Sequence, residues 1–173
     1  MSSNGATNAL VDILGSGSGE AGFEVVNAIA QEYGFKDSSI NQYLGDVSGD
    51  PSLKRTTAED CGRFMAAVYC GALVSAQASR SMLDLLMAQT RTSKIPSGLP
   101  AGTVTANKTG EIDGVENDVA IVFASSDTSA AIDGTAATGD YVLAVMSEDV
   151  PDSAAAQAEI RELSGVVWNA MAR

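Results

Sequence analysis

The stretch from Thr103 to Asp118, with the sequence TVTANKTGEIDGVEND, constrains the fold of this chain more than any other. Val104 and Ala106 alternate with polar residues, which is the two-residue period of a half-buried β-strand. The strand leads into the triplet Lys108-Thr109-Gly110, and Asp113-Gly114 then forms a dipeptide typical of a tight hairpin turn. The stretch therefore predicts a hairpin that carries an ammonium, a hydroxyl and an open backbone side by side at a strand end.

This triplet has the chemistry of an anion site. Lys108 continues the apolar side of the strand, so its ammonium should be partly desolvated and should attract an anion. Thr109 adds a hydroxyl that can bond the same carboxylate, and Gly110 lets a ligand come close to the backbone amide of Glu111. A lysine, a threonine and a glycine in a row are a weak signal by themselves, and the alternative is a hairpin with a surface lysine.

Hydrophobic periodicity predicts helices before this hairpin. The expected helices cover Ala6 to Leu14, Glu20 to Tyr33 (ended by Gly34), a segment opened by the capping box Thr56 to Glu59, and a segment capped by Ser75. The residues from Phe35 to Arg55 show no regular pattern, and an irregular loop of that length is more often functional than idle.

Strands and a last helix are expected after the hairpin begins. Val119 to Ala124 and Tyr141 to Met146 are apolar on both faces, and an amphipathic helix follows Pro151. Helices followed by an antiparallel meander indicate an α+β fold in which a helical part packs on a sheet. We expect residues 1–100 to form the mostly helical part and residues 101–173 the three-stranded antiparallel sheet with its C-terminal helix, as two parts of one domain.

Composition excludes several functions. The net charge of −12 argues against nucleic acid or an anionic membrane as partner. No apolar run is long enough to span a membrane, and no signal peptide is recognisable in this chain. Histidine is absent, which removes Ser-His-Asp and Cys-His catalysis and argues against a zinc site, so we expect neither a metal nor a cofactor.

The order of motifs resembles a known family. The pieces are the SxN motif Ser2-Ser3-Asn4, the segment Thr56 to Leu73, the approach Lys94 to Pro100, and Lys108-Thr109-Gly110. Together they resemble the C-terminal two thirds of the superfamily of class A serine β-lactamases and penicillin-binding proteins, and essentially the whole chain takes part. The resemblance implies a β-lactamase/transpeptidase-like fold that is truncated at its N-terminus.

The resemblance also implies roles for individual residues. In that superfamily the SxN serine relays a proton to the leaving nitrogen and the asparagine bonds the substrate amide, which would be Ser2 and Asn4. Lys108 and Thr109 would hold the substrate carboxylate at Gly110, and the backbone N–H of Glu111 would form half of the oxyanion hole. The structural alternative for Ser2 and Asn4 is a simple helix N-cap.

Two departures from the family pattern weaken the expectation of activity. No serine in the chain has a lysine three residues later, so the nucleophile motif SxxK is absent and would lie upstream of Met1 in a longer protein. The long loop contains no glutamate to activate a deacylating water, and the closest register places Asn41 there. An amide cannot act as a general base, so even a complete protein would deacylate poorly.

Other charged residues allow two interpretations. Arg91 and Lys94 could contribute to a ligand carboxylate, although solvated charges on a connector are the favoured interpretation. Asp113, Glu116 and Asp118 form a weak candidate cation site, and Trp168 on the last helix is expected to pack on the core or its rim.

Two functional hypotheses follow. The first is a fragment of a β-lactamase-like serine hydrolase, which in full length would transfer acyl groups from β-lactams or D-alanyl peptides and which is inactive alone. The alternative is a non-catalytic binding module that keeps the carboxylate site. The expected partners are a β-lactam or a peptidoglycan-type peptide, and an exposed sheet edge would favour homo-oligomers or domain swapping. A full-length family member would be extracytoplasmic.

Overall fold

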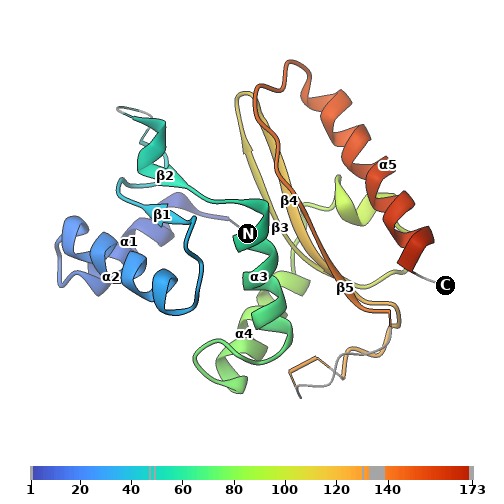
Figure 1. Ribbon diagram of the computed structural model, residues 1–173, viewed down its shortest axis with the longest axis horizontal. Coiled ribbons are helices and arrows are strands. Elements are labelled where there is room, and N and C mark those ends of the chain that lie inside the picture. The colour runs from blue at the N-terminus through green and yellow to red at the C-terminus, as the bar shows by residue number, and fades with distance from the viewer. Residues whose placement is uncertain (1, 47, 49, 130, 133–138, 172–173) are drawn as a thin grey trace. The chain divides into compact units, whose positions relative to one another are not determined.

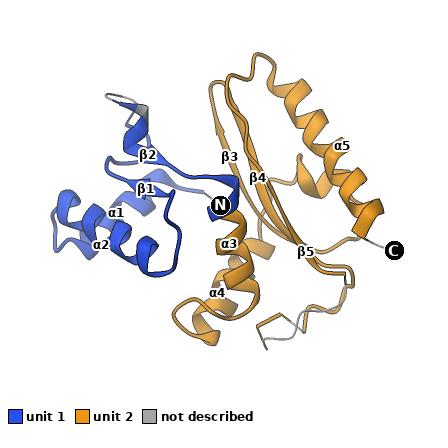
Figure 2. Cartoon of the chain, viewed as in Figure 1, with its two compact units in different colours: residues 1–60 blue, residues 61–173 orange. Residues whose placement is uncertain are grey.

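The computed structural model describes residues 2–46, 48, 50–129, 131–132 and 139–171 (Figure 1). The chain divides into two compact units, residues 1–60 and residues 61–173 (Figure 2). The boundary expected at residue 100 therefore falls inside the second unit. Within that unit the helix α4 (Ala76–Met87) packs against the strand β3 (Thr105–Ile112).

The first unit is a helix pair with a small sheet. It contains α1 (Asn4–Leu14), α2 (Gly19–Glu32), the antiparallel strands β1 (Ser39–Ile40) and β2 (Lys54–Arg55), and the 3₁₀ turn η1 (Pro51–Leu53). The two helices approach closely at Gly22, where a Cβ atom would lie 2.0 Å from the carbonyl oxygen of Val11. Val11 is the only hydrophobic side chain buried among the described residues of this unit, so its core is thin.

The loop from Phe35 to Arg55 is more ordered than the sequence predicts. The amide side chain of Asn27 accepts from the backbone N–H of Ile40 at 2.9 Å and donates to the carbonyl of the same residue at 3.0 Å. The Asn27 amide thereby satisfies the backbone groups of Ile40 as a neighbouring strand would, and β1 also pairs with β2. This tertiary partner, 13 residues away in sequence, is the reason that local pattern did not reveal the strands.

The second unit is built around an antiparallel sheet. Its strands are β3 (Thr105–Ile112), β4 (Val115–Val122) and β5 (Tyr141–Val145), in the order β3-β4-β5. The turn between β3 and β4 is the expected Asp113-Gly114, and Gly114 has a φ of +76°, a left-handed conformation that glycine adopts without steric cost. Within the register, Lys108 lies opposite Val119 and Glu111 lies opposite Glu116.

Helices cover both faces of this sheet. On one face lie α3 (Ala58–Tyr69) and α4 (Ala76–Met87), the latter capped by Ser75 as predicted. On the other face lie η2 (Ile95–Gly98) and α5 (Ser153–Met171). The core under α5 contains Ile95, Ala120, Val122 and Ile160, with Trp168 packed against it as expected. The α+β architecture expected from the sequence is thus confirmed, with the helical layer and the C-terminal helix on opposite faces.

Candidate functional site

The Lys108-Thr109-Gly110 triplet lies inside β3, which continues to Ile112 rather than ending at the triplet. β3 forms one edge of the three-stranded sheet (Figure 1). The backbone N–H of Phe123 donates to the carbonyl oxygen of Val104 at 3.1 Å, so the polar groups of Val104 face β4. Because this orientation alternates along an antiparallel strand, the N–H of Glu111 faces away from β4 and out of the sheet edge. The edge thus offers an outward donor beside the lysine.

The side chains of Lys108 and Thr109 leave the strand on opposite faces. Lys108 shares its face with the fully buried Ala106, yet is itself exposed. Thr109 is 5% exposed and shares its face with Asn107 and Glu111. A ligand therefore reaches the ammonium and the threonine hydroxyl together only by lying along the open edge of β3.

The Lys108 ammonium is partly desolvated, as the strand pattern predicts. Burial lowers its pKa below the usual value for lysine, and the nearby carboxylate of Glu111 acts in the opposite direction. The ammonium donates to the carbonyl oxygen of Thr109. The ammonium therefore lies at the strand edge, where an anion can approach it.

A buried lysine lies behind this edge, and the sequence did not predict it. Lys94 has no exposed surface, and its Nζ lies 2.8 Å from Glu116 Oε2, 3.1 Å from Glu111 Oε1 and 2.8 Å from the carbonyl oxygen of Asn117. Arg91 forms a second ion pair with Glu111. We call Lys94, Arg91, Glu111 and Glu116 the Lys94 cluster. The interpretation of Lys94 as a solvated connector charge is therefore wrong, because its charge is required between two carboxylates.

The Lys94 cluster keeps its two glutamates ionised. Burial pushes the pKa of Glu111 and of Glu116 upward, but the hydrogen bonds and the charge of Lys94 outweigh it and hold both pKa values below the usual value for glutamate. The signal for this arrangement was present in the sequence. A two-residue turn at Asp113-Gly114 sets Glu111 opposite Glu116, and two like charges in that position need a cation between them.

Asp118 fixes the connector to the sheet. Its carboxylate accepts from the backbone N–H of Ile95 at 3.0 Å and from Asn107 Nδ2 at 3.1 Å, and it has no exposed surface. Burial raises the pKa of Asp118 to about 6, against the opposing effect of these hydrogen bonds. Asn107 Nδ2 also donates to the carbonyl oxygen of Arg91 at 3.1 Å. Glu116 and Asp118 are thus engaged with protein partners, and Asp113 lies in the turn, so the three do not form the candidate cation site.

The SxN residues lie in the first unit. Ser3, between the two candidate residues, caps α1 by accepting from the backbone N–H of Ala6 at 3.2 Å. The alternative in which Ser2 or Asn4 is the N-cap is therefore wrong. Ser2 is exposed, and Asn4 begins the helix beside Gly45 of the long loop, where a Cβ atom would lie 3.1 Å from Asn4 Nδ2.

The long loop is held by amide and lysine side chains. Asn41, at the position where the family resemblance implies a glutamate, accepts from Asn27 Nδ2 at 2.9 Å. Asn8 pairs with the backbone of Leu44 in both directions, at 3.0 and 2.9 Å. Lys54 donates to Gln42 Oε1 at 2.7 Å. These bonds fix the course of the loop without providing a carboxylate at Asn41.

The described part of the chain contains neither a metal-binding cluster nor a membrane-spanning helix. No group of three or more histidine, cysteine, aspartate or glutamate side chains is arranged to hold a metal ion there. Within the same residues, no helix has both the length and the apolar composition to span a bilayer.

Comparison with solved structures places this fold among known proteins. The penicillin-binding protein PBP-A matches with 27% identity and a TM-score of 0.77, over 98% of this chain and 57% of its own. A β-lactamase from Sphaerobacter thermophilus matches with 26% identity and a TM-score of 0.77, over 97% of this chain and 58% of its own. A class A β-lactamase reconstructed as the last common ancestor of Gram-negative bacteria matches with 25% identity and a TM-score of 0.74, over 96% and 60%.

The chain therefore spans 57–60% of the length of these three proteins. No curated protein matches the sequence. The model of the β-lactamase enzyme family matches residues 1–171, which is nearly the whole chain. This chain belongs to the β-lactamase enzyme family.

Proposed function

We propose that this chain is the carboxylate-binding part of an acyl-transfer serine hydrolase that acts on β-lactams or D-alanyl peptides. The observation that carries the proposal is the open edge of β3, where the partly desolvated Lys108 ammonium stands beside the outward N–H of Glu111. An acyl-transfer site needs a cation for the substrate carboxylate and a preorganised donor for the developing oxyanion. The β3 edge supplies one of each.

We assign the roles by resemblance to the family, and the geometry of the β3 edge supports those of Lys108 and Glu111. Lys108 and the Thr109 hydroxyl bind the substrate carboxylate along the strand edge, and Gly110 leaves the backbone accessible. The N–H of Glu111 donates to the carbonyl oxygen as it gains negative charge. Ser2 relays a proton to the leaving nitrogen, and Asn4 bonds the substrate amide. A mutant of PBP-A has been solved as an acyl-enzyme complex with penicillin G, which supports a β-lactam as the ligand to test first.

The nucleophile is the element that these 173 residues do not supply. Without SxxK, no serine has the lysine that would activate it, so we expect neither turnover of a chromogenic cephalosporin nor a covalent adduct with a fluorescent penicillin. Intact-mass measurement after incubation checks the second point. A mass increase equal to that of the penicillin would refute the assignment of the nucleophile to another segment.

A binding measurement tests the carboxylate site independently of the acyl-transfer reaction. Titration of benzylpenicillin into the isotope-labelled chain should shift the amide signals from Lys108 to Glu111. Lys108→Gln should abolish the shifts, because the cation is lost, whereas Lys36→Gln makes the same change of charge at an exposed lysine of the first unit and should leave them intact. Equal shifts in both variants would mean that Lys108 is not the carboxylate partner.

The second candidate is a binding module without chemistry. It is favoured by Asn41 in place of a glutamate in the long loop. The coding sequence upstream of Met1 distinguishes the two functions. An in-frame SxxK motif supports the hydrolase, for which we also propose an extracytoplasmic location, and a closed frame supports the module.

A further inference from the structure

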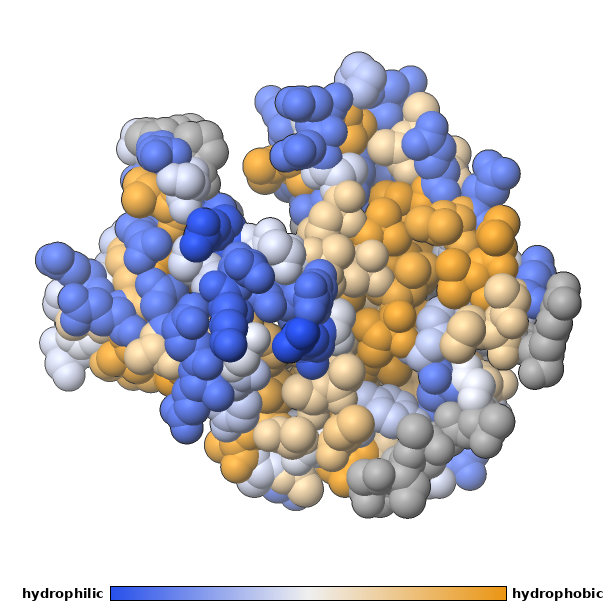
Figure 3. Space-filling view, viewed as in Figure 1, coloured by the Kyte–Doolittle hydropathy of each residue, from blue (hydrophilic) through white to orange (hydrophobic). Residues whose placement is uncertain are grey.

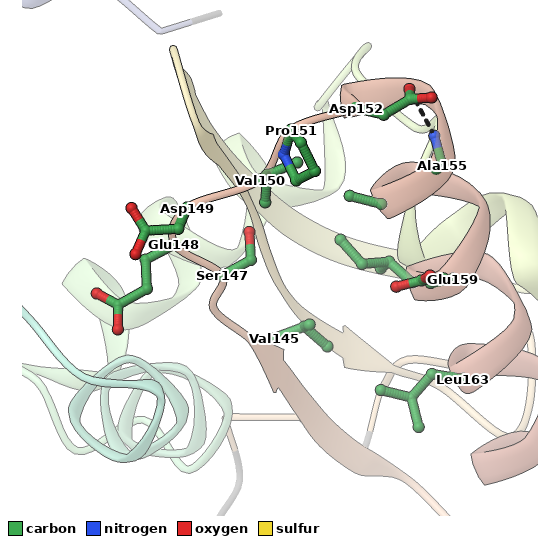
Figure 4. Close-up of a pocket in the computed structure, with 12 residues that line it drawn as sticks. Val145, Ser147, Glu148, Asp149, Val150, Pro151, Asp152, Ala155, Glu159 and Leu163 are labelled. Carbon is green, nitrogen blue, oxygen red and sulfur yellow. Dashed lines mark hydrogen bonds between the residues drawn. The ribbon is translucent and has the colours of Figure 1, made fainter.

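Positive charge on the sheet is confined to the β3 edge. Arg91, Lys94 and Lys108 interact there with one another and with nearby acids. No lysine or arginine occurs between residues 109 and 160, a range that includes β4 and β5. Much of the surface over β5 and the facing side of α5 is hydrophobic (Figure 3). The hollow at the end of β5 is lined by acidic side chains, among them Glu159 (Figure 4).

Glu111 brings a carboxylate into this group of cations. Its Oε1 lies 3.1 Å from Lys94 Nζ, and its Oε2 pairs with Arg91. The Glu111 side chain is 26% exposed, and its pKa is held below the usual value for glutamate, so it is ionised at neutral pH. Lys94 also pairs with Glu116, at 2.8 Å. One lysine therefore serves two carboxylates and cannot neutralise Glu111 alone.

The charge of Glu111 reaches the Lys108 ammonium. Burial has the largest effect on the pKa of Lys108 and lowers it. Among the charged neighbours Glu111 has the largest effect and raises this pKa by more than Arg91 lowers it, and Asp118 likewise outweighs Lys94. The surroundings of the ammonium are therefore negative on balance, so a ligand that has paired one carboxylate with Lys108 finds no further cation in excess.

A D-alanyl peptide in the proposed site has its last residue beside Glu111. Its terminal carboxylate binds at Lys108 and Thr109, and its scissile carbonyl oxygen accepts from the N–H of Glu111. The last residue of the peptide joins these two groups. Thr109 and Glu111 share one face of β3, and residues two apart on a strand are separated by about 7 Å. A charge on the last residue of the peptide therefore comes within interaction distance of the Glu111 carboxylate.

We propose that Glu111 is a specificity residue that excludes peptides whose C-terminal residue carries a second carboxylate. This inference rests on the proposed function, because it assumes that Lys108 and Thr109 hold the terminal carboxylate. A second carboxylate on the same residue is repelled by Glu111, since like charges a few ångströms apart repel each other near a protein surface. An uncharged C-terminal residue meets no such repulsion.

Arg91 limits the strength of this exclusion. Its side chain is 65% exposed and pairs with Glu111, so it offsets part of the negative charge. Loss of the Glu111 charge should therefore weaken the discrimination, whereas loss of Arg91 should strengthen it. These opposite signs separate an electrostatic role from a general disturbance of the strand, which would lower the affinity for every peptide alike.

The test titrates N-acetyl-D-alanyl-D-asparagine and N-acetyl-D-alanyl-D-aspartate into the isotope-labelled full chain and follows the amide signals from Lys108 to Gly110. We expect the asparagine peptide to bind about fivefold more tightly, an effect typical of partly exposed charge pairs. This ratio should shrink as NaCl rises from about 50 to about 500 mM.

Three variants test the source of the ratio. Glu111→Gln should lower it below about twofold, and Arg91→Gln should raise it to about tenfold. Glu162→Gln makes the same change of charge as Glu111→Gln at an exposed position of α5 and should leave the ratio at the wild-type value.

The outcomes distinguish this inference from the proposed function. Equal binding of the two peptides by the wild-type chain would overturn the role of Glu111 and leave the carboxylate site intact. Tighter binding of the aspartate peptide that Arg91→Gln abolishes would do the same, because Arg91 would then pair with the ligand instead of Glu111. If neither peptide shifts the amide signals in any variant, the carboxylate site itself is refuted, and the role of Glu111 with it.

Discussion

The residue with the greatest structural consequence is Lys94. Its ammonium lies between the carboxylates of Glu111 and Glu116, which face each other across the β3–β4 hairpin. Water screens the pair of Lys94 and Glu116 little, since the Lys94 side chain is fully buried and the Glu116 side chain is 6% exposed. The Lys94 cation therefore offsets the repulsion between Glu111 and Glu116 that the hairpin register creates. It also holds the side chain of Glu111, whose backbone N–H we assign to the oxyanion hole.

Replacing Lys94 should destabilise the chain strongly. Lys94→Met leaves a buried carboxylate without its cation, a change that typically costs about 3 kcal/mol of unfolding free energy. Adding Glu116→Leu should recover part of the loss, because the uncompensated charge is then gone. Urea denaturation measures both effects. Arg91→Met is the control, because the Arg91 side chain is 65% exposed and exposed ion pairs contribute about 1 kcal/mol or less. Equal losses of unfolding free energy in Arg91→Met and Lys94→Met would contradict the stabilising role of the buried cation.

Asp118 should make stability depend on pH in a direction opposite to that of a typical carboxylate. Its pKa is raised from 3.8 to about 6 in the folded state, so the folded chain binds the proton more tightly than the unfolded chain. The contribution of Asp118 is therefore greatest below about pH 4 and is lost as the pH rises through about 6.

The measurement compares wild type with Asp118→Asn. The difference in unfolding free energy between them should change between pH 4 and pH 7 by up to about 3 kcal/mol, given about 1.4 kcal/mol for each unit of pKa shift. A carbon-detected NMR titration of the Asp118 carboxyl group gives the pKa directly. A midpoint near 4 would show that burial does not control this group.

At the scale of elements, close backbone approach decides how α5 lies on η2. Ser164 Oγ donates to the carbonyl oxygen of Ile95 at 2.9 Å. A Cβ atom on Gly98 would lie 2.1 Å from the carbonyl oxygen of Arg161 and 2.9 Å from Ser164 Cβ. The contact exists because small residues face each other there, and it positions the connector that carries Lys94.

A methyl group at Gly98 should loosen this contact. Gly98→Ala forces either α5 or η2 to move, and overpacking of this kind costs about 1–3 kcal/mol. Gly62→Ala adds the same methyl group in the interior of α3, where the nearest atom, Ala144 Cβ, is 3.9 Å away. That variant should gain up to about 1 kcal/mol from helix propensity. Thermal unfolding distinguishes them, and a stabilised Gly98→Ala protein would disprove the close approach.

At the scale of the whole molecule, the sequence predicted what depends on local pattern. The order of helices and strands, the turn at Asp113-Gly114 and the cap at Ser75 all follow from periodicity and turn chemistry within a few residues. Local pattern could not reveal the burial of Lys94, because its partner Glu116 is 22 residues away in sequence. It could not reveal the strand at Ile40 either, because the partner of Ile40 is Asn27, 13 residues away. In the candidate site, the desolvation of Lys108 was predictable from the alternation of apolar and polar residues along β3. The Lys94 cluster behind it could be predicted only from the pairing register of β3 and β4.

The two units should differ in stability because their cores differ. The second unit buries hydrophobic side chains from its helices and its sheet, whereas Val11 is the only hydrophobic side chain that is buried in the described part of the first unit. Few buried apolar contacts mean that a region opens with a small free energy, while core strands open only when the whole unit unfolds. Native-state hydrogen exchange on the full chain should therefore show weak protection in α1 and α2 and the strongest protection in β4.

A single substitution sharpens this expectation. Val11→Ala removes roughly 2 kcal/mol of packing at the contact between α1 and Gly22. Because that contact lies within the first unit, exchange should accelerate in α1 and α2 and stay unchanged at Val119 to Val122. If the β4 amides accelerate by the same factor, the chain unfolds as one cooperative body, and the division at Asp60 has no energetic meaning.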